Sequence, residues 1–394
     1  MGIYLSYSSN IIYNAWMETL NVPQGEFQLS RYPVRKDEKL RAWDAADEYL
    51  LNYFSENNSL LDNARKILII NDGFGALAAG LSQYNITAWN DSYLAQQGVL
   101  NNFSKNNLDD SHLQQLTSIE IPADNYDAVL IKIPKSLALL EDQLARIKPL
   151  LQFNTTIIAA GMVKTIHTST LKLFEKYIGD TKTSLAKKKA RLIFSTVNKG
   201  INTSQSPYPK KYVLEKTDYN IVNHANVFSR ESLDIGTRFF IQHIPTSERY
   251  EKIIDLGCGN GIVGLIAAEK NPQAELLFID SSYMAVESAK QTYENASLTN
   301  PKVIFKAGDC LSEVKKNSAD LILNNPPFHQ DNSIGDETAW KMFKQSKEVL
   351  KKNGELLVIG NRHLGYHVKL KKVFGNCEVI ATNKKFVILK SVKV

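Results

Sequence analysis

A glycine-rich segment in the second half of the chain, DLGCGNGIVG, has the residue types that hold a nucleotide-like ligand. Asp255 lies near the end of an apolar run, and Gly257, Gly259 and Gly261 follow it at alternate positions. Glycine is needed where the backbone turns sharply and approaches a ligand closely. Asp280, at the end of the next apolar run, suits the hydroxyl groups of a ribose. The pattern fits a dinucleotide or another nucleoside cofactor, and a glycine turn without ligand is the plain alternative.

A second motif, Asn325-Pro326-Pro327-Phe328, follows the apolar run ADLILN. Two prolines cannot continue a strand ladder, so the strand must end and present Asn325 at the sheet edge where α/β proteins bind ligands. An aromatic amine is a weak nucleophile because its lone pair is delocalised into the ring. The carbonyls of Asn325 and Pro326 can accept both of its N–H groups, and Phe328 can stack on the base. A strand-end turn without chemistry is the alternative.

These motifs resemble motif I and the N-P-P-(F/Y) motif of class I S-adenosylmethionine-dependent methyltransferases that act on planar nitrogens. The resemblance implies that the glycine segment and Asp280 hold S-adenosylmethionine, with Asn325 beside it. Asp309, after the run VIFKAG, stands where this fold can bind the adenine amino group, although a plain loop acid is nearly as good an interpretation. His329 is a secondary candidate for proton relay, because a methylated amine loses its proton readily.

The elements that must position these motifs occur twice along the chain. The matched pairs are residues 66–81 with 252–268, 86–103 with 276–293, 126–134 with 319–327, 155–161 with 355–360, and 190–197 with 385–392. Five matched elements in the same order indicate a duplication. Near-continuous Ile/Leu/Val strands that alternate with helices predict an α/β fold with two tandem doubly wound, Rossmann-like domains, each a parallel sheet with helices on both faces.

The length of 394 residues agrees with two domains. We expect the first domain at residues 1–200, a linker at 201–225 and the second domain at 226–394, with its first helix starting near Asp234. The linker prediction rests on the segment NKGINTSQSPYPKKY, which is rich in Ser, Asn, Pro and Lys.

The net charge of +6 is unevenly distributed. Residues 164–216 carry a local balance of +9 and residues 341–394 one of +10, so the remainder sums to −13. Two basic segments in an otherwise acidic chain favour an anionic partner such as RNA. Lys187, Lys188, Lys189 and Arg362 are the candidate RNA contacts. Solvated lysines and a surface salt bridge of Arg362 are equally good alternatives.

The cysteines Cys258, Cys310 and Cys377 lie far apart without a CxxC pair. This spacing excludes a disulfide framework and a cysteine-based zinc site, and it predicts a cytoplasmic protein without a metal. No apolar run approaches the ~20 residues of a membrane span, so we expect no membrane partner. We expect the chain to act as a monomer.

Longer segments resemble one family. NGELLVIGNRHLGYHVKLKKVFGN and FSRESLDIGTRFFIQHIP are similar to the bacterial ribosomal-RNA guanine-N2 methyltransferases, and FQLSRYPV and LRAWDAADEYLL are similar to their large-subunit (RlmG-type) members. The resemblance covers nearly the whole chain from residue 27 and implies methyl transfer to N2 of a guanine in 23S rRNA. A 16S rRNA enzyme (RsmC-type), an adenine-N6 or glutamine-N5 methyltransferase, and a non-catalytic RNA-binding assembly factor are the alternatives.

The first copy keeps the fold pattern but lacks both motifs. In place of the glycine segment it has NDGFG at residues 71–75, which we align as two residues shorter, with Phe74 in the space a cofactor needs. In place of the second motif it has IKIPK at residues 131–135. We interpret residues 1–200 as a degenerate methyltransferase-like domain that binds RNA or acts as a scaffold. Asp91 keeps the acid of the second strand, which leaves small-molecule binding there open.

Overall fold

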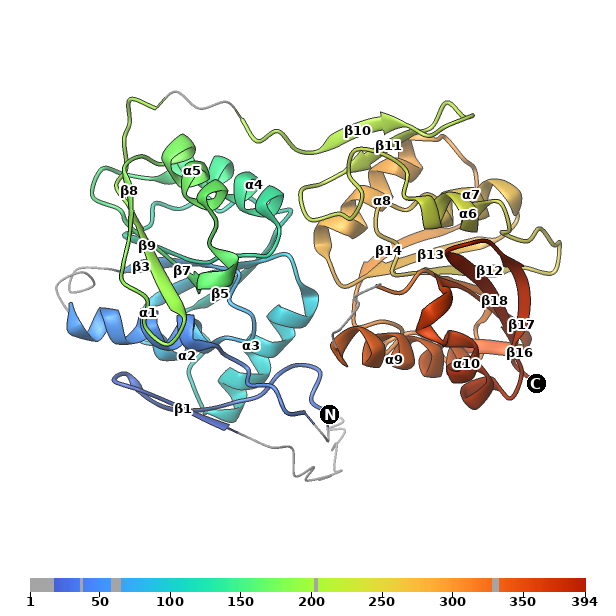
Figure 1. Cartoon of the computed structure of the whole chain (residues 1–394), viewed down its shortest axis with the longest axis horizontal. Helices are drawn as coiled ribbons and strands as arrows, with labels where there is room; N and C mark the ends of the chain where they lie inside the picture. The colour runs from blue at the N-terminus through green and yellow to red at the C-terminus, as the bar shows by residue number, and fades with distance from the viewer. Residues whose placement is uncertain (1–17, 36–37, 58–64, 202–204, 328–332) are drawn as a thin grey trace, which may run out of the picture.

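The computed structural model describes residues 18–35, 38–57, 65–201, 205–327 and 333–394, which form two domains side by side (Figure 1). Each domain is built on a seven-stranded sheet. The first sheet contains β3 (Lys66–Ile70), β4 (Asn85–Asn90), β5 (Leu113–Thr117), β6 (Ala128–Lys132), β7 (Thr156–Met162), β8 (Thr181–Thr183) and β9 (Ala190–Ser195). The second contains β12 (Lys252–Leu256), β13 (Glu275–Asp280), β14 (Val303–Ala307), β15 (Ala319–Asn324), β16 (Leu350–Asn361), β17 (Glu378–Thr382) and β18 (Phe386–Val392).

The strand order confirms the duplication. It is β5-β4-β3-β6-β7-β9-β8 in the first sheet and β14-β13-β12-β15-β16-β18-β17 in the second, which is the same order in the two copies. The sheets are mixed, however, and not fully parallel as the sequence pattern predicted. β9 and β18 run antiparallel to β7 and β16, and β8 and β17 pair with them antiparallel. A short hairpin joins β8 to β9 and another joins β17 to β18, whereas a parallel pair needs a long crossover connection.

Helices cover both faces of each sheet. The first domain has α1 (Ala45–Glu56), α2 (Ala76–Gly80), α3 (Tyr93–Lys105), α4 (Leu137–Ile147) and α5 (Thr168–Tyr177). The second has α6 (Ile235–Ile241), α7 (Ile262–Lys270), α8 (Tyr283–Asn295), α9 (Ser333–Val349) and α10 (Tyr366–Phe374). Buried side chains of α1–α3 and of α6–α8 form a core on one face, and those of α4–α5 and α9–α10 form a core on the other.

Two small hairpins complete the described chain. The first, β1 (Glu18–Val22) with β2 (Gly25–Leu29), packs its alternating apolar residues into the first domain. The second, β10 (Lys210–Val213) with β11 (Asn220–Asn223), lies inside the segment predicted as a linker. Ile221 and Val222 of β11 are buried, and the Val222 N–H donates to the Thr292 hydroxyl of α8 at 3.0 Å. Part of the linker is therefore packed against the second domain, because its Ile-Val pair buries apolar surface that the polar composition around it conceals.

The domains meet at the carboxyl ends of their parallel strands. Ser92 and Ser282, which precede α3 and α8, form an antiparallel β-bridge. The Tyr93 N–H donates to the Ser281 carbonyl and the Tyr283 N–H donates to the Asp91 carbonyl, both at 2.9 Å. The ligand-binding edge of the second sheet thus faces the corresponding edge of the first.

In the N-terminal domain, the buried carboxylate of Asp72 ties the start of α2 to the end of β3. Asp72 accepts the N–H groups of Gly75 at 3.0 Å, Ala76 at 3.1 Å and Ala78 at 2.9 Å, so it satisfies the free donors that begin α2. Gly75 itself is the N-cap of α2 and has a positive φ of 84° without a side-chain cap.

We predict that Asp72→Ala destabilises the protein by about 2 kcal/mol or more, because it leaves buried donors without an acceptor. Urea denaturation followed by circular dichroism measures the change. Asp109→Ala is the control, since the exposed Asp109 carboxylate bonds only locally, to Ser111, and its loss should stay within about 0.5 kcal/mol. Equal stability of the two variants would contradict the assigned role of Asp72.

Candidate active site

The glycine turn between β12 and α7 uses its glycines in different ways. Gly257, Gly259 and Gly261 all have positive φ, at 76°, 55° and 80°. A Cβ added at Gly259 would meet no atom within 4 Å, so the backbone there borders open space that a ligand can enter. A Cβ at Gly261 would lie 2.8 Å from Ala289 of α8, and one at Gly264 would lie 2.2 Å from the Phe278 ring. These two glycines allow close packing of α7.

Asp255 supports the glycine turn by accepting a hydrogen bond from the first turn of α7. It is buried, and its Oδ2 accepts the Gly264 N–H at 2.8 Å. Burial raises the pKa of Asp255 to about 7, against the effect of the Gly264 hydrogen bond. The helix position that donates to Asp255 corresponds to Ala78, which donates to Asp72 in the first copy. The geometry gives Asp255 a supporting task for the turn, and its contact with a cofactor stays a prediction.

Asp280 joins the turn to the next strand. Its Oδ2 accepts the Gly259 N–H at 3.1 Å and its Oδ1 accepts the Ser282 N–H at 3.0 Å. Burial raises the pKa of Asp280, while these two donors favour the carboxylate. The structure therefore brings Asp280 and the glycine turn together, as the sequence predicted, on the edge that faces the first domain.

Asp309 lies next to Asp280 through the 2.9 Å bond from the Gly308 N–H to the Asp280 carbonyl. Its side chain is buried and forms an ion pair with Lys341 of α9. Lys341 was not identified from the sequence, because a lysine in an amphipathic helix with as many acids as lysines carries no signal of an inward position. The pair holds Asp309 beyond the end of β14, close to Asp280, and its contact with a cofactor stays a prediction.

Asn325 follows the last residue of β15, so the strand ends where the two prolines predicted. Its Nδ2 donates to the Thr237 hydroxyl at 3.4 Å, and Thr237 is held in turn by Asp234, the N-cap of α6. Within the described part of the chain no donor reaches the buried Oδ1 of Asn325. Pro326 is buried and Pro327 is exposed, while Phe328 and His329 lie outside the described residues.

Two further asparagines lie at this edge, of which Asn361 was expected there from the sequence and Asn324 was not identified. Asn324 is fully buried, and its Nδ2 donates to the Leu256 carbonyl at 2.8 Å, which joins the ends of β15 and β12. Asn361 ends the neighbouring strand β16. The Oδ1 atoms of both are buried and have no donor among the described residues.

The predicted RNA contacts occupy equivalent places in the two copies. The Arg362 N–H donates to the Lys385 carbonyl at 3.0 Å, and the Val163 N–H donates to the Lys189 carbonyl at 2.8 Å. Both bonds lie just beyond the carboxyl ends of β16 and β7, so both basic turns belong to the edges where the domains meet. Arg362 and Lys189 are exposed.

Lys187 and Lys188, two of the predicted RNA contacts, also have acidic neighbours. Lys187 lies 3.5 Å from a Glu56 carboxylate oxygen, and Lys188 lies 2.9 Å from one of Glu48. Exposed pairs of this kind contribute only about 0.2–1 kcal/mol each, so both lysines remain able to exchange partners.

The turn of the first copy is not shorter than that of the second, contrary to the sequence alignment. The N–H groups of Asn71 and Gly257 make the same bond to the neighbouring strand, and Gly75 and Gly261 both cap the following helix, so the turns have equal length. Phe74 occupies the turn position of Asn260, with the Arg31 guanidinium 5.0 Å from its ring centre.

Lys132, which ends β6 in the first copy, is committed within its own domain. It lies 2.7 Å from Asp44 and 2.8 Å from Asp47, and its side chain is largely buried. The anions that Lys132 contacts are therefore carboxylates of its own domain.

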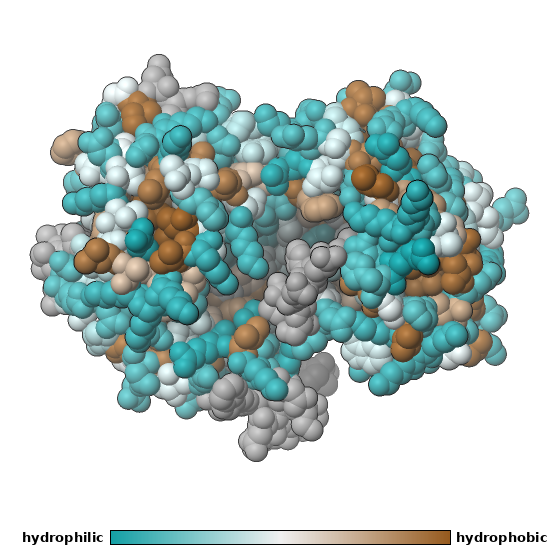
Figure 2. Space-filling model, in the orientation of Figure 1, coloured by the Kyte–Doolittle hydropathy of each residue, from teal (hydrophilic) through white to brown (hydrophobic). Residues whose placement is uncertain are grey.

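The surface is hollowed between the two domains (Figure 2). A cleft on the carboxyl edge of the first sheet reaches the second domain at Asn226 and at Thr338 of α9. Arg31, Tyr32 and Arg35 line it from the first domain. In the described ranges, no helix is long and apolar enough to cross a membrane, and no group of His, Cys, Asp and Glu side chains could hold a metal ion.

Comparisons with known proteins agree over the whole chain. The RLMG N-terminal domain model matches residues 17–199, and the Methyltransferase small domain model matches residues 218–390. Ribosomal RNA large subunit methyltransferase G of Streptomyces griseus is 45% identical over 383 residues, which cover 96% of this chain and 100% of the relative. The protein of the same name from Photobacterium profundum is 48% identical over 367 residues, which cover 93% and 97%.

Among solved structures, the T. thermophilus 16S rRNA N2 G1207 methyltransferase (RsmC), in complex with AdoMet and guanosine, is similar with a TM-score of 0.71. The match covers 97% of this chain and 99% of that chain at 16% identity, so it shows that the two proteins share the fold.

We predict that Gly259→Ala weakens S-adenosylmethionine binding at least tenfold while it lowers stability by only about 1 kcal/mol, the strain of a left-handed alanine. Gly264→Val should destabilise the protein by about 3 kcal/mol, because the new side chain overlaps the Phe278 ring. Isothermal titration and urea denaturation separate the two effects. Cofactor affinity of the wild-type level in Gly259→Ala would show that the open space is not the ligand site.

Proposed function

This chain belongs to the family of the ribosomal RNA large subunit methyltransferases G, and we propose that it transfers the methyl group of S-adenosylmethionine to the exocyclic N2 of a guanine in 23S rRNA. The observation that carries the proposal is the buried Asn325 Oδ1, which has no donor among the described residues. A buried acceptor without a partner costs about 1–3 kcal/mol, and such groups are found where a ligand completes them.

The residues present fit the cofactor. Gly259 borders open space, and the Asp280 carboxylate lies beside it in the position that holds ribose hydroxyls in this fold. Asp309 would contact the adenine, and Gly257 and Gly261 shape the backbone around the ligand. When bound, S-adenosylmethionine supplies an electrophilic methyl group on a sulfonium.

Asn325 orients the amine. Because its Nδ2 is engaged by Thr237, the amide presents its carbonyl oxygen as the free end. That oxygen and the backbone carbonyl of Pro326 would each accept one N–H of the target amine, which directs the nitrogen lone pair at the methyl group. Transfer to that nitrogen would form an N–C bond at the expense of the S–C bond, whose electron pair would stay on sulfur, and the surplus proton of the amine would leave to water. Stacking of Phe328 on the base stays a prediction.

The free acceptors at the carboxyl edge of the second sheet favour guanine over adenine as the target base. A guanine offers N1–H beside its two N2–H groups, whereas the exocyclic amine of adenine is flanked by acceptors. The carbonyl oxygen of Asn361 at the end of β16 is a second acceptor without a donor in the described structure. An edge with several free acceptors suits the base that has more donors, and the glutamine amide alternative supplies only two.

Ribosomal RNA would bind along the joined carboxyl edges. The basic turns with Lys189 and Arg362 lie on these edges, and the cleft between the domains brings Arg31 and Arg35 close to α9. Such cations can track phosphates with little sequence information. A cytoplasmic monomer that acts on 23S rRNA without a metal completes the proposal.

We predict that Asn325→Ala lowers methyl transfer to RNA at least 100-fold, because the amine loses its acceptor, and leaves the Kd for S-adenosylmethionine within about threefold of wild type. Transfer is measured with labelled cofactor and binding by calorimetry. Thr237→Val should reduce transfer by a smaller factor, since the amide can then rotate, and Thr237→Ser should restore it. Full activity of Asn325→Ala would refute the amine clamp.

The RNA surface gives a separate prediction. Replacement of Lys187, Lys188 and Lys189 by glutamine should weaken RNA binding and reduce the slope of log K against log salt by about 0.7–0.9 for each phosphate that the protein no longer neutralises. The control replaces Lys315 and Lys316, which precede β15 and therefore lie at the opposite edge of the second sheet. The cofactor affinity should not change in either variant. Equal RNA affinity and equal salt slopes in the two variants would restrict the first domain to a scaffold.

A further inference from the structure

Asp91 lies one residue beyond the position of Asp280, contrary to the sequence comparison that matched the two acids. Asp280 ends β13 two residues before Ser282, the N-cap of α8, whereas Asp91 directly precedes Ser92, the N-cap of α3, and Asn90 takes the position of Asp280. Asp280 lies beside the open glycine turn of the second domain. Asp91 is only 5% exposed, although no cofactor motif surrounds it in the first domain.

Four donors occupy the Asp91 carboxylate. Its Oδ1 accepts the Ser118 hydroxyl at 2.6 Å and the Met284 N–H at 2.8 Å. Its Oδ2 accepts the Ser282 hydroxyl and the Asn226 amide, both at 2.6 Å. Three of these donors come from the other side of the domain boundary, so the small-molecule binding that the sequence left open at Asp91 is replaced by a contact between domains.

The backbone of the two turns is paired as well. The bridge between Ser92 and Ser282, with the backbone bonds that Tyr93 and Tyr283 donate, joins the two acid turns face to face. Met284 adds an apolar seal, because it packs with Ala138 and Leu139 of the first domain. The first domain therefore holds residues 281–284 in place through side-chain hydrogen bonds, backbone hydrogen bonds and apolar packing.

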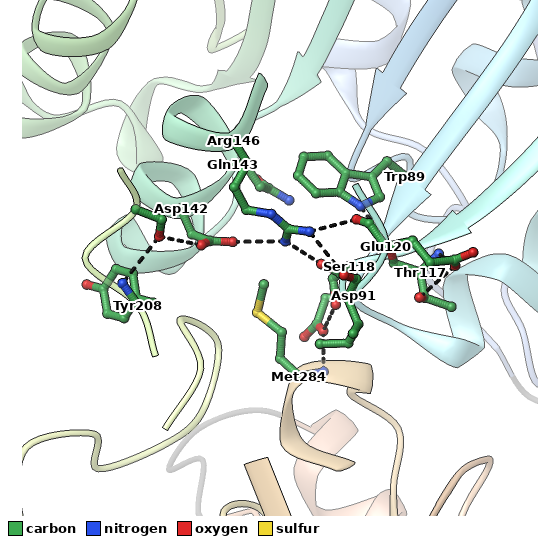
Figure 3. A network of polar contacts seen from close by, with 12 residues as sticks. Trp89, Asp91, Thr117, Ser118, Glu120, Asp142, Gln143, Arg146, Tyr208 and Met284 are labelled. Carbon is green, nitrogen blue, oxygen red and sulfur yellow. Dashed lines mark hydrogen bonds and ion pairs between the residues drawn. The ribbon is translucent and has the colours of Figure 1, made fainter. Parts of the chain in front are cut away.

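Arg146 positions the first-domain side of this contact (Figure 3). Arg146 of α4 donates to the carbonyls of Ser118 and Glu120, the latter at 2.7 Å, and its guanidinium lies 4.8 Å from the centre of the Trp89 ring. Its ion pair with Asp142, at 3.3 Å, completes the network. Ser118 is fixed by these contacts, and it fixes Asp91 in turn.

The turn at residues 281–284 reaches the cofactor site through one residue. Ser282 donates its N–H to the Asp280 Oδ1 at 3.0 Å and its hydroxyl to Asp91. The other oxygen of Asp280 accepts the Gly259 N–H. Since hydrogen bonds fix Asp280 from both sides, a shift of the Ser282 turn moves the carboxylate away from the open space at Gly259.

We propose that Asp91 is a positioning residue for cofactor binding: this buried acid of the first domain holds the turn that carries Asp280 in the second. This inference rests on the role of Asp280 in the proposed function. The first domain thereby contributes to the affinity for S-adenosylmethionine, in addition to any contact it makes with RNA.

The test is Asp91→Asn in the full-length protein, with cofactor binding measured by calorimetry and steady-state kinetics with rRNA. Asparagine keeps the shape but turns an N–H pair toward donors, so the turn should loosen. We expect the Kd and the KM for S-adenosylmethionine to rise about tenfold, in the usual range of coupling between sites. The kcat at saturating cofactor and the KM for RNA should stay within about twofold of wild type.

Tyr93→Phe is the matched control. It removes another bond of the same interface, from the Tyr93 hydroxyl to Glu313 at 2.8 Å, and leaves residues 281–284 untouched. Its cofactor affinity should equal that of wild type, and an equal loss in both variants would overturn the inference in favour of general loosening. If Asp91→Asn fails to fold, Ser282→Ala replaces it, with an expected weakening of about fivefold. An unchanged Kd in that variant would equally overturn the inference.

Asp280→Asn separates this inference from its premise. Weak cofactor binding in Asp280→Asn together with wild-type binding in folded Asp91→Asn would overturn the positioning role and keep the proposed role of Asp280. Wild-type binding in Asp280→Asn would refute the cofactor role of Asp280, and the inference about Asp91 would fail with it.

Discussion

The strand order of the second sheet is the constraint on which the site depends. β12 lies between β13 and β15, and parallel strands end at one edge, so the glycine turn, Asp280 and Asn325 meet although they are far apart in sequence. The bond from Asn324 to the Leu256 carbonyl locks the ends of β12 and β15 together. The glycine turn proposed for the cofactor and the proposed amine acceptor Asn325 therefore lie at one edge without any long loop having to carry them there.

The duplicated domain shows how the same frame serves another purpose. Its glycine turn is as long as that of the second domain, and Asp72 ties the helix as Asp255 does, from a different position relative to the turn. What has changed is the chemistry exposed at the edge. Phe74 lies under Arg31, Lys132 is neutralised by two carboxylates, and Asp91 binds the partner domain. Each of these residues stabilises the packing of the first domain or the domain boundary.

Most of the fold and the core of the site could be predicted from the sequence, because glycine, proline and apolar runs act through local backbone rules. The repeat located every central strand, and the prolines after Asn325 marked the end of β15 correctly. Contacts between distant residues had no such signal. The bond between Thr237 and Asn325 spans 88 residues and that between Asp91 and Ser282 spans 191. The antiparallel direction of β9 and β18 was missed because an apolar run reveals that a strand is buried but not which way it runs.

The identity of the methylated nucleoside is the decisive observation for the proposed reaction. Digested 23S and 16S rRNA from a strain without this protein would be compared by mass spectrometry with rRNA from the same strain expressing it. We expect N2-methylguanosine to decrease in 23S rRNA without the protein and to return with it, while 16S rRNA does not change. A change in N6-methyladenosine, a change confined to 16S rRNA, or unchanged rRNA would contradict the proposed reaction.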